Sequence, residues 1–217
     1  MKYRAVIFDL WQTLVPWSVE ASDRFYERMA DAIGVDHDRF RVAWVDGRPG
    51  REIGPIAEHL RGLFTDLGVD GDLEQLMSMR MTWVKESLVP RSDALATLDE
   101  LRRRQYRLGL ISVCSQEVSR VWEETSLGGK FDATVFSCDV GISKPDPRIY
   151  EIACERLEVE PAECLFVGDG ANDELPGAER VGMSAVQLRA PGEELTEPGK
   201  AWQGASIEHL REVLRLA

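Results

Sequence analysis

Short apolar runs alternate with stretches of helical periodicity along the chain from Pro90 onward. Strands that alternate with helices in this way form a parallel sheet with helices on both of its faces. A segment rich in Pro, Gly and Glu, 190–204, predicts a surface loop. The pattern predicts strands at 107–113, 133–136, 164–167 and 185–188, and helices at 93–105, 117–125, 147–157, 175–181 and 207–216.

An earlier apolar run, Tyr3 to Phe8, is assigned to the same sheet. It has the length of a strand, it contains the β-formers Val6 and Ile7, and Asp9 follows it directly. In an α/β sheet of this kind, ligands bind at the carboxyl ends of the strands. Asp9 is therefore a candidate site residue, although a lone Asp in this place can also cap a turn.

Residues 15–89 show no strand pattern. Apolar residues recur there at helical spacing in four stretches, and Gly34 and Gly68 are plausible helix stops. We interpret the Met and Trp stripes as the core of a small all-helical unit. We therefore expect an α/β, Rossmann-like core domain formed by 1–14 and 90–217, and an inserted helical cap domain at 15–89. An insertion at this point would lie over the carboxyl ends of the strands as a lid.

The composition narrows the possible partners. The chain has 217 residues, of which 44% are hydrophobic and 29% charged. Its net charge of −12 disfavours binding to nucleic acid and to anionic lipid. No apolar run approaches the roughly 20 residues of a membrane span, and the N-terminus does not resemble a signal peptide. The four cysteines form no CxxC pair, so we expect buried, reduced thiols and a cytoplasmic location. Nothing in the sequence specifies an oligomeric state.

Polar side chains fall at the ends of successive predicted strands. One charged residue in such a place has ordinary explanations, such as capping a turn. Several at the same edge of one sheet are typical of a functional site. The residues are Asp9 and Thr13 after the first strand, Ser112 at the end of the next, Lys144 before Pro145, and Asp169 and Asp173 after the strand at 164–167.

The charges of these residues point to a particular chemistry. Asp9, Asp169 and Asp173 would repel one another in a dry cleft. A bound Mg²⁺ would relieve that repulsion, because it prefers carboxylate and carbonyl oxygens and keeps waters for an oxyanion substrate. Lys144 would offset charge on the nucleophile or on a phosphoryl group, and Ser112 can donate a hydrogen bond. This set favours covalent catalysis through an aspartyl intermediate.

Taken in this order, the residues resemble the four motifs of the haloacid dehalogenase (HAD) superfamily. The resemblance covers the predicted core, and the segment 15–89 matches the position of that family's cap. It implies a Mg²⁺-dependent hydrolase that acts on a small phosphorylated or other anionic metabolite. Asp9 matches the nucleophile, Thr13 the hydroxyl that follows it, Ser112 the second motif, Lys144 the third, and Asp169 with Asp173 the acidic fourth motif.

Trp11 departs from the pattern of the family's phosphatases, which carry a second Asp two residues after the nucleophile. That Asp protonates the leaving group and later activates water, and an indole can do neither. The main-chain carbonyl of Trp11 can still bind the metal, and its side chain is either a packing residue under the cap or a wall of the substrate pocket. Family dehalogenases carry an aromatic residue at this position and use no metal, whereas Asp169 and Asp173 favour a Mg²⁺ site. A 2-haloacid dehalogenase and a catalytically silent binding protein therefore remain alternatives.

The predicted cap contains one basic cluster, Arg48 and Arg51, in the glycine-rich segment 47–54. One interpretation is a solvated connection between helices. The other is a specificity loop that presents these arginines to an anionic substrate.

Overall fold

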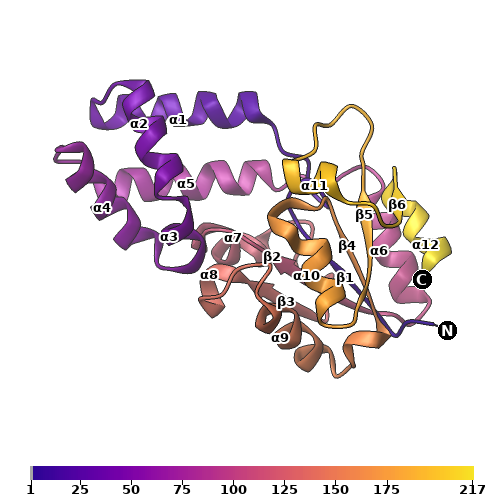
Figure 1. Ribbon diagram of the computed structural model, residues 1–217. Coiled ribbons are helices and arrows are strands. Elements are labelled where there is room, and N and C mark those ends of the chain that lie inside the picture. The colour runs from indigo at the N-terminus through magenta and orange to yellow at the C-terminus, as the bar shows by residue number, and fades with distance from the viewer. Residues whose placement is uncertain (1) are drawn as a thin grey trace.

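The computed structural model describes residues 2–217, so the first residue of the predicted core range lies outside the description. Its centre is a parallel sheet in the order β3-β2-β1-β4-β5-β6, with β1 between β2 and β4 (Figure 1). The α/β fold predicted from the sequence is confirmed. The strands are β1 (Ala5–Phe8), β2 (Arg107–Ser112), β3 (Ala133–Phe136), β4 (Cys164–Gly168), β5 (Ser184–Leu188) and β6 (Ser206–Ile207).

The apolar residues of β1 divide between two cores, one on each face of the sheet. Val6 and Phe8 belong to one core, whereas Ala5 and Ile7 belong to the other. Alternate side chains of a strand point to opposite faces, so a strand that is apolar throughout is buried from both sides. The first core is completed by α6 (Ala94–Arg103), α7 (Gln116–Val121) and α12 (Val213–Leu216), and the second by α9 (Pro147–Leu157) and α10 (Glu174–Arg180).

Five helices between β1 and β2 form a separate helical block with its own apolar core (Figure 1). Ser18 caps the first of them by accepting a hydrogen bond from the N–H of Ala21, and Gly34 ends it in the left-handed conformation that favours glycine. All five lie inside the predicted cap range 15–89. They are α1 (Val19–Ile33), α2 (His37–Asp46), α3 (Arg48–Ile53), α4 (Ile56–Leu67) and α5 (Leu73–Ser87).

Three local predictions were wrong. The segment 47–54, predicted as a loop, contains α3, which packs on α8 (Ser137–Val140), where the Ser137 hydroxyl donates to the carbonyl of Glu52 at 2.6 Å. These tertiary contacts outweigh the low helix propensity of its glycines. Ile207, placed at the start of a helix, instead pairs with Leu188 in the sheet, and helical structure begins with η4 (Leu210–Glu212).

The predicted loop 190–204 contains a short helix, α11 (Glu197–Ala201), which Thr196 caps. Other short helical turns are η1 (Trp122–Glu124), η2 (Pro161–Glu163) and η3 (Ala171–Asp173). Within residues 2–217, no helix combines the length and the apolar character that crossing a bilayer requires.

Candidate active site

Lys144 lies at the centre of a buried polar cluster at the carboxyl edge of the sheet. Its ammonium donates to Asp9 Oδ1 at 2.5 Å, to a carboxylate oxygen of Glu174, and to the carbonyl of Ile111 at 3.2 Å. Asp9 directly follows β1, Ile111 is near the end of β2, and Glu174 opens α10 after β4. Parallel strands therefore bring together residues that are far apart in the sequence.

Burial and neighbouring charges shift the pKa values of the groups in this cluster. Burial alone would lower the pKa of Lys144, but the charges of Asp9 and Glu174 raise it above its ordinary value. Burial, with the charge of Asp9, raises the pKa of Asp169 to about 6, and the same causes raise the pKa of Glu174 well above its ordinary value. When all three are ionised, the carboxylates of Asp9, Asp169 and Glu174 share one ammonium group, and burial together with this imbalance favours the protonated forms of Asp169 and Glu174.

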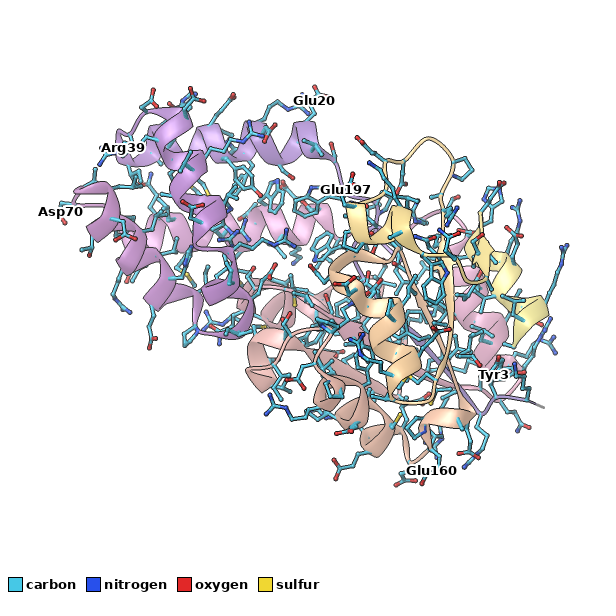
Figure 2. All side chains as sticks on the ribbon, in the orientation of Figure 1. Tyr3, Glu20, Arg39, Asp70, Glu160 and Glu197 are labelled. Carbon is cyan, nitrogen blue, oxygen red and sulfur yellow. The ribbon has the colours of Figure 1, made fainter. Side chains whose placement is uncertain are left out.

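The three carboxylates of this cluster are close enough to share one cation. Asp9, Asp169 and Glu174 each offer an oxygen, and these oxygens lie within 4.8 Å of one another. Asp169 Oδ2 is buried without a hydrogen-bond partner among residues 2–217. An all-oxygen donor set with an unpartnered carboxylate oxygen fits Mg²⁺. By contrast, the acidic side chains of Glu20, Asp70 and Glu160, labelled in Figure 2, are exposed.

The structure does not bring Asp173, the predicted metal ligand, into this cluster. Asn172 and Asp173 have positive φ angles of 55° and 53°, and the side chains of both are exposed. This turn places the next residue, Glu174, in the site, where its second oxygen accepts from the N–H of Gly170 at 3.0 Å. Gly168 makes room for it, since a Cβ there would lie 2.1 Å from Glu174 Oε1. Glu174 was not predicted from the sequence. Its only signal there is that it is an acidic residue directly after Asp173, the predicted ligand.

Ser112 and Thr13 are both fully buried, and neither hydroxyl has a hydrogen-bond partner among residues 2–217. Ser112 follows Ile111, whose carbonyl binds Lys144, and it therefore lies next to the polar cluster. Thr13 follows Gln12, a residue with a positive φ of 59°. Arg91 fixes this turn by donating to the carbonyls of Gln12 at 2.8 Å and Thr13 at 2.7 Å. Both predicted hydroxyls thus have unused hydrogen-bonding capacity.

A pocket of about 330 Å³ lies between the core and the helical block. We call the carboxylates and Lys144 its base, and the side chains from α2, α3 and α5 its roof. Trp11 is half-buried and lines the pocket, with its ring in edge-on contact with Trp17 at 5.2 Å between centroids. It is thus both a packing residue and a wall. The aromatic residues that line the pocket are Trp11, Trp17, Tyr26, Trp44 and Trp83.

The two predicted arginines lie on α3 and both line the pocket, but their environments differ. Arg48 is exposed and pairs with Glu52 at 2.6 Å, whereas Arg51 is only 8% exposed. The interpretation of a solvated connection is therefore wrong for Arg51. A third arginine was not predicted: Arg80 is buried and pairs with Glu117 of α7 at 2.6 Å. The sequence signal for Arg80 is that a charged residue interrupts an apolar stripe of a predicted helix.

The fold and this cluster define a general class: an α/β protein whose acidic and basic groups meet in a buried pocket at the carboxyl edge of its sheet. A family model described as haloacid dehalogenase-like hydrolase matches residues 3–182. The chain belongs to this family, as its four motifs predicted.

Relatives of two kinds are similar to this chain. A glyceraldehyde 3-phosphate phosphatase of Methanopyrus kandleri is 36% identical over 105 residues, which are 47% of this chain and 44% of the relative. The (S)-2-haloacid dehalogenase 4A of Burkholderia cepacia is 36% identical over 125 residues, 56% of this chain and 52% of the relative. The chain thus spans about half the length of these curated relatives. A solved HAD phosphatase from Thermococcus onnurineus has a TM-score of 0.71 and 26% identity, and the match covers 98% of this chain and 97% of that one.

Proposed function

We propose that this protein is a Mg²⁺-dependent hydrolase of a small phosphorylated or otherwise anionic metabolite, with Asp9 as the nucleophile. The observation that carries the proposal is the base of the pocket, where Asp9, Asp169 and Glu174 converge around Lys144. A metal-free displacement has no use for three carboxylates in one buried place. A Mg²⁺ ion held by these residues and by the main-chain carbonyl of Trp11 would supply charge stabilisation for a phosphoryl group.

The chain's own residues account for the covalent steps. A carboxylate oxygen of Asp9 attacks phosphorus, the bond to the leaving oxygen breaks, and an aspartyl phosphate forms. Lys144 donates to Asp9 Oδ1 at 2.5 Å and offsets the charge on the phosphoryl oxygens. We assign the hydroxyls of Ser112 and Thr13, which have no hydrogen-bond partner among residues 2–217, as donors to those oxygens. Water then attacks phosphorus, which releases phosphate and restores the Asp9 carboxylate. Closure of the helical block would exclude bulk water.

The leaving group in this reaction has no proton donor at position 11. Among the described residues, the only other acid that lines the pocket is Glu52, which is already paired with Arg48. Leaving groups that depart as stable anions, such as phenolates or carboxylates, need no protonation. We therefore propose that aryl or acyl phosphates are hydrolysed in preference to alkyl phosphates.

The second candidate is a 2-haloacid dehalogenase, in which Asp9 displaces halide from carbon. Trp11 favours it, because halide needs no proton donor and because the indole provides an apolar wall. One relative named above is also a haloacid dehalogenase. Metal dependence and halide release separate this reaction from the first.

A substrate panel tests the two reactions directly. Aryl phosphates, alkyl phosphates and 2-haloacids would be assayed with Mg²⁺ and with a chelator, using wild type and Asp9→Asn. We expect hydrolysis of an aryl phosphate that requires Mg²⁺ and disappears in the variant. Halide release that persists with the chelator would replace the leading proposal with the second. No turnover of any substrate, with Mg²⁺ still bound, would indicate a protein that only binds its ligand.

A further inference from the structure

The three arginines that line the roof differ in their partners. Arg48 pairs with Glu52 and Arg80 pairs with Glu117, so each of these two pairs is locally neutral. Among residues 2–217, no carboxylate lies within ion-pair distance of Arg51, which is 8% exposed. The roof therefore keeps one buried, uncompensated positive charge.

The guanidinium of Arg51 is held by one edge and open at the other. Its Nη1 donates to the carbonyl of Trp44 at 2.6 Å and lies 3.5 Å from His59 Nε2. Its Cζ lies 4.0 Å from the centroid of the Trp44 ring, which fixes the plane of the group. Among the residues that the structure describes, Nε and Nη2 donate to no protein acceptor. These two nitrogens form the edge with which arginine binds a carboxylate through two parallel hydrogen bonds.

The surroundings of Arg51 compensate its charge only in part, through the nearby carboxylate of Glu52. Burial and the nearby charge of Arg80 lower the pKa of Arg51 to about 10, which leaves it cationic at neutral pH. Burial and Arg51 together lower the pKa of His59 to about 4, so this imidazole is neutral and adds no charge. An unpaired buried charge is costly, and an anionic ligand would remove that cost.

Trp44 provides a second unused donor in the same roof. Trp44 lines the pocket and is buried, and its indole Nε1–H has no acceptor within residues 2–217. A buried N–H without a partner loses the free energy of a hydrogen bond. Among residues 2–217, the Nε–Nη2 edge of Arg51 and the indole N–H of Trp44 therefore both lack an oxygen acceptor.

We propose that the free edge of Arg51 and the indole N–H of Trp44 form an anion subsite that binds a carboxylate of the substrate, remote from the group that Asp9 attacks. This proposal rests on the proposed function in taking the base as the reacting end. A carboxylate is favoured over a second phosphate because its two planar oxygens match the free guanidinium edge and the pocket is small, at about 330 Å³. The substrate class is a small carboxylic acid that carries the reacting group at its other end.

A binding experiment tests the subsite without any turnover. Benzoate and benzamide have nearly the same shape and differ in charge, so their dissociation constants would be compared by calorimetry. A chelator keeps metal ions away from the carboxylates of the base. These carboxylates then repel benzoate, so benzoate does not bind at the base. We expect wild type to bind benzoate about tenfold to a hundredfold more tightly than benzamide, the range expected for hydrogen bonds to a charged group. Equal binding of the two probes, or no detectable binding of benzoate, would overturn the proposal.

Two variants assign the preference to the named groups. Arg51→Met keeps an apolar side chain of similar length and should abolish the preference for benzoate. Trp44→Phe keeps a ring but removes the N–H, and it should weaken the binding of benzoate roughly threefold to tenfold and the binding of benzamide, whose acceptor is uncharged, by less. The matched control is Arg39→Met, because Arg39 also donates to one backbone carbonyl, that of Leu67, but lies outside the pocket. Unchanged benzoate affinity in both pocket variants would contradict the assignment, and Trp44→Phe remains informative where Arg51→Met fails to fold.

A kinetic comparison separates this subsite from the proposed reaction. 4-Carboxyphenyl phosphate should have a higher kcat/KM than phenyl phosphate in wild type, and Arg51→Met should remove that advantage. A preference for benzoate without turnover of either phosphate would refute the reaction and retain the subsite. Turnover of both phosphates at equal efficiency, without a preference for benzoate, would retain the reaction and refute the subsite.

Discussion

The base of the pocket is assembled from the ends of strands, and its roof from helices of the inserted block. At the base, three carboxylates lie together with one lysine, whereas two of the three arginines of the roof pair with glutamates, Glu52 of α3 and Glu117 of α7. The two halves therefore carry excess charge of opposite sign across one small cavity. A ligand with a metal-bound anionic group at one end and a carboxylate at the other would compensate both.

The largest expected effect is at the base. Asp9→Asn removes the nucleophile, so kcat/KM for an aryl phosphate should fall at least about 10⁴-fold. Folding should survive, because Lys144 keeps its contact with Glu174. Steady-state kinetics and thermal unfolding of the same preparation would check both statements. Residual activity within about tenfold of wild type would show that Asp9 is not the nucleophile.

Breaking the Arg80–Glu117 pair, which anchors the roof to α7, should mainly lower the stability of the folded protein. Arg80→Met leaves Glu117 buried without its cation, so the free energy of unfolding should fall by about 3–5 kcal/mol. The double variant Arg80→Met/Glu117→Gln should recover part of that loss, because no unpaired charge remains. Denaturant unfolding measures both variants and the single variant Glu117→Gln. A double variant as unstable as the sum of its single changes would mean that the pair is not coupled.

The base contains a smaller contrast between two neighbouring acids. Glu174→Gln should weaken Mg²⁺ binding about tenfold to a hundredfold, because it disturbs both the oxygen cluster and Lys144. Asp173→Asn changes an exposed side chain outside the cluster and should leave the Mg²⁺ dissociation constant within about twofold. Calorimetric titration of both variants decides which acid serves the site, and the reverse pattern would restore the prediction made from the sequence.

The base was more predictable than the roof for a physical reason. Asp9 and Asp169 directly follow apolar strands, Ser112 ends one, and Lys144 lies in the connection after β3; a parallel sheet brings the ends of its strands to one edge whatever the details of packing. The exchange of Asp173 for Glu174 depends on two left-handed residues in one turn, Asn172 and Asp173. Asn and Asp adopt this conformation more readily than other non-glycine residues, but the sequence does not show that both do so in succession. Element type was therefore predictable, but the direction of a side chain within a tight turn was not.

The roof depends on contacts between helices that no local pattern specifies. The glycines of segment 47–54 predicted a loop, yet packing against α8 makes α3 helical and carries Arg51 into the pocket. Arg80 lies in an apolar stripe of α5, and its partner Glu117 lies 37 positions later in the core. Periodicity shows which face of a helix is buried, but it does not show which charge on another element meets it.

The smallest expected effect concerns Trp11, which belongs to the wall between base and roof. Trp11→Asp restores a proton donor two residues after the nucleophile, so kcat/KM for an alkyl phosphate should rise about tenfold. An aryl phosphate should gain nothing, because its leaving group departs without a proton and because the variant loses the contact with Trp17. Trp11→Phe is the matched control, since it keeps an aromatic wall and adds no acid. A gain of the same size in Trp11→Phe, or on both substrates alike, would mean that Trp11 limits access to the pocket rather than replacing a catalytic acid.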